Sequence, residues 1–107
     1  MILLFFKLLF SHIIFDFPMQ GDFLARAKNH ANPISQVPAG LILAYHAFLH
    51  ACGVYYFTQS AICASIEFLT HMLFDFCKNA EIINFKEDQV FHILVKFIIA
   101  AFAFYSK

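Results

Sequence analysis

The chain has 107 residues, of which 62% are hydrophobic and 13% are charged, and its mean hydropathy is +0.73. So few polar residues cannot cover the surface of a soluble domain of this size, and the composition therefore predicts an integral membrane protein in contact with the lipid bilayer. Seven basic and seven acidic residues cancel, which excludes the basic surface that nucleic-acid binding requires.

Four apolar runs predict an all-α fold in which one domain, residues 1–107, forms a bundle of four short transmembrane helices. We expect these helices near residues 2–20, 37–58, 60–78 and 88–106. Three of the apolar runs are shorter than the ~20 residues that span an average bilayer, so flanking polar turns or a thinned membrane must make up the difference.

Three connections link the four predicted helices. Residues 23–29 (FLARAKN) predict one or two amphipathic turns at the membrane interface, between the first helix and the second. The link around residues 58–60 is so short that it forces the second and third helices into an antiparallel hairpin. Residues 79–87 form the last loop.

Each predicted helix carries a row of polar side chains about four residues apart. At roughly 100° per residue, such side chains share one face of their helix. Because ionisable groups are costly in a bilayer, these faces should point into the bundle. The rows are His12 and Asp16; His46 and His50; Glu67, His71 and Asp75; and Asp88, Gln89, His92 and Lys96.

The rise of about 1.5 Å per residue places most of these side chains in one half of the bundle. Counted from the face with the first and third loops, three histidines lie roughly 9 to 12 Å deep and three further groups about 3 to 6 Å deep. The first set is His12, His46 and His71, and the second is Asp16, Asp75 and His92. His50 and Glu67 lie deeper, at about 17 to 18 Å.

Neutral imidazole together with carboxylate suits zinc, iron or manganese, and helix bundles build such sites from inward-facing pairs. We therefore predict a divalent metal site. Its expected ligands are His12, Asp16, His46, His71, Asp75 and His92. Around them, as supporting residues or as ligands of a second metal, we expect Gln20, His50, Glu67, Asp88 and Gln89. In an enzyme, a metal-bound water would attack a lipid or another substrate at the interface.

Two other interpretations remain open. The same residues could line a proton or ion path in a small oligomeric channel or carrier, since chains of Asp, Glu and His also line transporters. They could also serve only as hydrogen bonds that specify the bundle. A chain this short has little room for its own substrate cavity, so a homo-oligomer fits each interpretation.

Basic residues near the helix ends predict the orientation. The first and third loops carry Arg26, Lys28, Lys78 and Lys86, whereas the opposite face has only Lys107. By the positive-inside rule, these two loops face the cytoplasm and both termini lie outside it.

The order and spacing of the polar residues resemble those of a family of small bacterial and phage membrane proteins known as domain of unknown function 3307. The matching residues are His12-x3-Asp16-Phe17-x2-Gln20, Lys28, His46-x3-His50, His71-x3-Asp75-x2-Lys78 and Asp88-Gln89-x2-His92. Pro18 is a less expected residue within this pattern.

The resemblance implies a bacterial inner-membrane location and leaves the activity open. It also implies a distant similarity to membrane proteins labelled metal-dependent hydrolases, and a phage or prophage accessory protein that binds a host membrane partner is a further expectation.

Overall fold

A computed structural model describes residues 1–34 and 36–106, and Lys107, which entered the charge count, lies outside them. The described chain is all-α, as predicted, and contains five helices rather than four. They are α1 (Ile2–Asp16), α2 (Gly21–Ala27), α3 (Ala39–Thr58), α4 (Ala61–Asn79) and α5 (Phe85–Tyr105).

The additional helix arises because the first expected helix breaks. We expected it to reach residue 20, but α1 ends at Asp16 and a turn that contains Pro18 follows. Proline has no backbone N–H to continue a helix. Gly21 then adopts a φ of +72°, which side chains other than glycine rarely tolerate, and α2 leaves at 87° to α1. The expected amphipathic segment is therefore a helix of its own.

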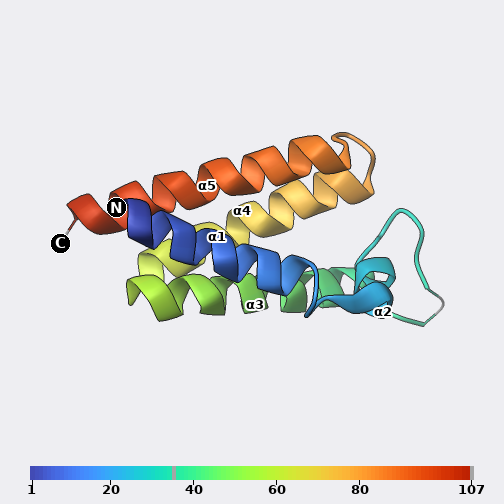
Figure 1. Ribbon diagram of the computed structural model, residues 1–107. Helices are drawn as coiled ribbons and strands as arrows, with labels where there is room; N and C mark the ends of the chain where they lie inside the picture. The colour runs from blue at the N-terminus through green and yellow to red at the C-terminus, as the bar shows by residue number, and fades with distance from the viewer. Residues whose placement is uncertain (35, 107) are drawn as a thin grey trace.

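The four long helices run antiparallel and close into a ring (Figure 1). Helix α3 packs between α1 and α4, and α5 packs between α4 and α1. Both described termini lie at one end of the bundle, together with the α3–α4 link, whereas α2 and the α4–α5 link lie at the other end (Figure 1). The molecule measures 46 × 22 × 22 Å.

Local hydrogen bonds fix where α4 and α5 begin. The Ser60 hydroxyl accepts from the Cys63 N–H at 3.2 Å and caps α4. At α5, the Asn84 side chain accepts from the Glu87 N–H at 2.8 Å, and the Glu87 carboxylate accepts from the Asn84 N–H at 3.1 Å. This capping box starts α5 at residue 85, three residues before the expected start.

Two of the described helices, α3 and α5, are long and apolar enough to cross a membrane, and the bent pair α1–α2 makes a third if it acts as one span. Helix α4 is not among them. It carries Glu67, Asp75 and Lys78 within 19 residues, and these charged side chains lower its hydropathy.

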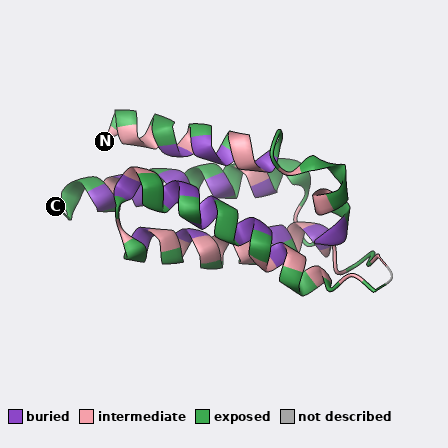
Figure 2. Cartoon of the chain, turned by 90° about the horizontal axis from the view of Figure 1, so that it is seen from below, coloured by how far each residue is buried: buried purple, intermediate pink, exposed green. Residues whose placement is uncertain are grey.

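Buried residues follow the inner faces of all four long helices (Figure 2). Towards the end with the termini the interior is apolar, and towards the α2 end it is polar. The apolar cluster consists of Leu8, Val54, Cys63, Ile99, Ala100 and Ala103. Most of the buried polar residues are those that the sequence placed on the inner faces, joined by Ser11, Lys28, Thr58 and Asn79. The buried histidines and carboxylates define the candidate site.

Candidate metal centre

Five of the six histidines meet in the polar half of the bundle. Neighbouring ring centroids lie 3.8 Å apart for His50 and His71, 4.3 Å for His71 and His92, and 4.7 Å for His46 and His50. His12 lies 5.1 Å from His92. All five side chains are buried, and every long helix contributes at least one of them.

One oxygen of Asp16 is the point on which three of these rings converge. Asp16 Oδ1 lies 2.9 Å from His50 Nε2, 3.1 Å from His46 Nε2 and 3.8 Å from His71 Nε2. Asp16 is the last residue of α1, and its carboxylate lies against histidines of α3 and α4.

These four residues can offer four ligand atoms that all lie within 4.8 Å of one another. Such a set is geometrically able to hold a metal ion. It includes three of the expected ligands, Asp16, His46 and His71, and also His50, which we expected among the supporting residues. His71 Nε2 is buried and has no hydrogen-bond partner among the described residues, which leaves its lone pair free for a cation.

Asp75 lies beside this set and contacts two lysines. Its Oδ2 lies 2.5 Å from Lys28 Nζ, and its Oδ1 lies 3.0 Å from Lys78 Nζ. Lys28 follows α2, and its side chain enters the bundle from the end. Burial lowers the pKa of the Lys28 ammonium, and the charge of Asp75 opposes that shift.

Glu67 occupies the layer nearer the apolar core. Its Oε1 accepts from Lys96 Nζ at 2.6 Å and lies 3.4 Å from His71 Nδ1. Lys96 is therefore the counter-charge of Glu67 rather than a free cation. Glu67 therefore lies near Nδ1 of the His71 ring, whereas Asp16 lies near Nε2 of the same ring.

Gln89 links α5 to the centre. Its amide donates to Asp16 Oδ2 at 3.1 Å and to Asp88 Oδ2 at 3.3 Å, and its carbonyl oxygen lies 3.0 Å from His12 Nε2. His92 Nε2 lies 3.0 Å from Asp88 Oδ1. His12 thus contacts the Gln89 amide, and His92 contacts the Asp88 carboxylate. Neither histidine belongs to the four-residue set.

The remaining polar residues lie at the edge. Gln20 donates to the Asp16 main-chain oxygen at 3.1 Å. His30, the sixth histidine, stacks on Phe76 at a ring-centroid distance of 4.0 Å, outside the cluster of five. Asn79, which was not among the expected site residues, donates to the Lys28 main-chain oxygen at 3.1 Å. Its place four residues after Asp75, on the same helix face, was the signal available in the sequence.

The charges in this interior do not balance evenly. Among the described residues, Glu67, Asp75 and Asp88 each have a lysine as an ion-pair partner. Asp16 is also buried, at 8% exposed, yet its partners are histidines and the Gln89 amide. Among the buried carboxylates that the structure describes, that of Asp16 is therefore the one without a lysine or arginine partner.

The fold and the site define a class: an all-α protein with membrane-length helices and a buried histidine–carboxylate centre between them. Residues 4–107 match the family model described as Protein of unknown function (DUF3307), and the chain belongs to that family. Comparison with curated proteins and with solved structures gave no significant match.

Proposed function

We propose that this protein is a membrane-embedded, metal-binding helix bundle whose ligands are Asp16, His46, His50 and His71. The observation that carries the proposal is that, among the described residues, no lysine or arginine pairs with the buried Asp16 carboxylate. An ionised carboxylate without a counter-charge is costly in a low-dielectric interior, by several kcal/mol after relaxation. A divalent ion among three imidazoles and this oxygen removes that cost.

The burial of the site supports a structural metal over a catalytic one. Asp16 is 8% exposed, and the three histidines are at most 1% exposed. Structural zinc sites are closed, with four protein ligands, whereas catalytic sites keep a position open for water. We therefore propose that the ion holds α1, α3 and α4 together, and we give the hydrolase interpretation second place.

A proton or ion path is supported less well. The polar residues fill one half of the bundle and end at Glu67 and Lys96. Beyond that pair, among the described residues, the interior is the apolar cluster around Leu8, Val54 and Ile99. Such an apolar core does not replace the hydration shell of an ion, so a path would need an interface between copies of the chain.

Metal content of the purified protein tests the proposal. In detergent, we expect about one divalent ion per chain, with zinc as the preferred metal. Both Asp16→Asn and His50→Gln should lose that ion. A chelator should lower the unfolding temperature of the wild-type protein, because an ion bound only to the folded state contributes about 2.7 kcal/mol at a hundredfold excess over Kd.

The matched control is His30→Gln, since His30 stacks on Phe76 outside the centre. This variant should keep the ion and the response to chelator. Folded wild-type protein that contains no divalent ion, and that takes up none when zinc, iron(II) or manganese(II) is added, would refute the proposal.

A further inference from the structure

One carboxylate oxygen beside the centre is close enough to serve as an additional ligand. Asp75 Oδ2 lies 3.9 Å from His46 Nε2 and 3.9 Å from His71 Nε2. It therefore faces the two imidazoles of the proposed site. A small rotation of the Asp75 side chain would bring this oxygen to an ion held there.

The Lys28 ammonium occupies that same oxygen. Lys28 Nζ lies 2.5 Å from Asp75 Oδ2, and Lys78 Nζ contacts the other oxygen, Oδ1. An ammonium in direct contact with Oδ2 competes with a metal ion for its lone pairs, because both bind it through positive charge.

Lys28 is also held in place. It is 2% exposed, and its main-chain oxygen accepts from the Asn79 side chain at 3.1 Å. Withdrawal of the ammonium would leave the buried Asp75 with Lys78 as its one lysine partner among the described residues. The contact between Lys28 and Asp75 is therefore a fixed part of the bundle.

We infer that Lys28 is a specificity-determining residue that keeps Asp75 out of the coordination shell and so fixes the ion at four protein ligands. The inference rests on the proposed function. Three imidazoles and one carboxylate match the tetrahedral coordination of zinc. A second carboxylate would raise the coordination number and favour the more oxygen-rich sites of manganese or iron.

Cobalt(II) is the probe, because its visible absorption is intense in four-coordinate sites and weak in five- or six-coordinate ones. The full-length protein in detergent is loaded with cobalt. We expect a four-coordinate spectrum for the wild type and a weaker, higher-coordinate spectrum for Lys28→Met, with manganese(II) bound about tenfold more tightly. Adding Asp75→Asn to Lys28→Met should restore the wild-type spectrum.

Lys78→Met is the matched control, since it removes an ammonium from the same carboxylate but leaves Oδ2 with Lys28. It should keep the four-coordinate spectrum. If wild-type and Lys28→Met proteins both bind cobalt with identical spectra, the inference falls while the proposed function stands. If the wild type binds no cobalt or zinc, the proposed function itself fails.

Should Lys28→Met not fold, the single variant Asp75→Asn decides. Because Asp75 is not a ligand while Lys28 holds it, the cobalt spectrum and stoichiometry of Asp75→Asn should equal those of the wild type. A changed spectrum or lost binding would identify Asp75 as a ligand in the wild type and overturn the inference.

Discussion

The free-energy cost of each buried charge in this bundle depends on the partner that the charge contacts. Lys96 and Glu67 are each 1% exposed or less, and their side chains meet at 2.6 Å. A buried ion pair contributes little net stability, but removal of one partner leaves a charge that nothing compensates. The same reasoning, applied to Asp16, led to the metal proposal.

At this scale we expect Lys96→Met to lower the free energy of unfolding by about 3 to 5 kcal/mol, because Glu67 loses its counter-charge. The double variant Lys96→Met/Glu67→Gln should recover most of that loss. Denaturant unfolding in detergent of the wild type, both single variants and the double variant measures the coupling. A double variant as unstable as the sum of the two singles would show that the pair is not coupled.

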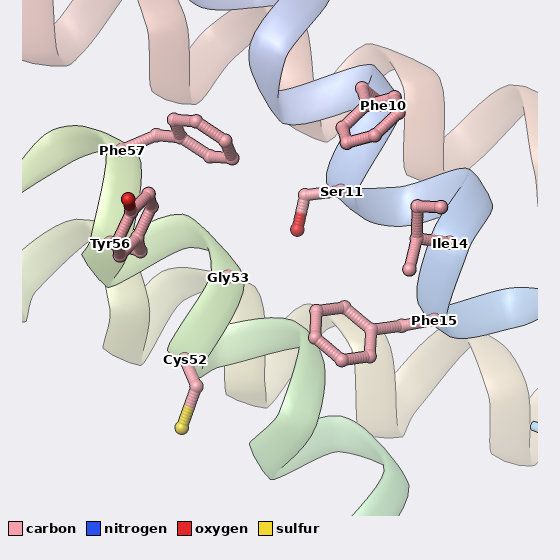
Figure 3. Close-up of a pocket in the computed structure, with 8 residues that line it drawn as sticks. All are labelled: Phe10, Ser11, Ile14, Phe15, Cys52, Gly53, Tyr56 and Phe57. Atoms are coloured by element: carbon pink, nitrogen blue, oxygen red, sulfur yellow. The ribbon is translucent and has the colours of Figure 1, made fainter. Parts of the chain in front are cut away.

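At the scale of elements, α1 and α3 approach closely at Gly53 of α3. Figure 3 shows Ser11 and Phe15 of α1 across an apolar groove from Gly53 of α3. A Cβ added at Gly53 would clash with Ser11 Oγ and lie 3.1 Å from a Phe15 ring carbon. Because Phe15 also packs on His50 at 5.8 Å, this contact sets how near α1 brings Asp16 to the histidines of α3.

We therefore expect Gly53→Val to destabilise the bundle by about 1 to 3 kcal/mol through overpacking. Metal affinity should fall as well, since α1 and Asp16 move away from α3. Gly40→Val is the matched control on the same helix, because a Cβ there has nothing within 4 Å. Thermal unfolding and zinc titration of both variants provide the comparison, and equal effects at the two positions would contradict this account of the packing.

At the scale of the whole molecule, the two ends of the bundle differ in charge less than the sequence count implies. Of the four basic residues counted in the first and third loops, Lys28 is buried against Asp75 and Lys78 pairs with Asp75 and Asp88. Arg26, whose side chain is 64% exposed and pairs with Asp22 at 3.3 Å, and the exposed Lys86 remain at the surface. The expected orientation therefore rests mainly on these two exposed basic residues.

We propose that the α2 end faces the cytoplasm of a bacterial inner membrane and that the termini face outward. In a background with the three cysteines replaced, Asp22→Cys and Ser106→Cys place single thiols at exposed positions of opposite ends. A membrane-impermeant thiol reagent added to intact cells should label position 106 and spare position 22. The reverse pattern would invert the topology.

The sequence by itself determined the class of protein and the inner faces. Apolar runs and an i, i+4 spacing are local properties, and they predicted an all-α chain with buried rows such as Glu67, His71 and Asp75. Pro18 and Gly21 are local signals for the end of the first helix, but they do not fix the 87° angle at which α2 leaves α1.

Only the tertiary structure decided which polar groups meet. The rotation and tilt of the helices bring Lys96 to Glu67, and the Lys28 side chain, which follows α2, reaches Asp75. Asp16 is left with the imidazoles of the four-residue set. Periodicity places a residue on a face and at a depth, but it contains no information about the neighbour across the bundle. That neighbour depends on packing between residues distant in sequence, and here it separates the carboxylate of the proposed metal site from those already neutralised by lysine.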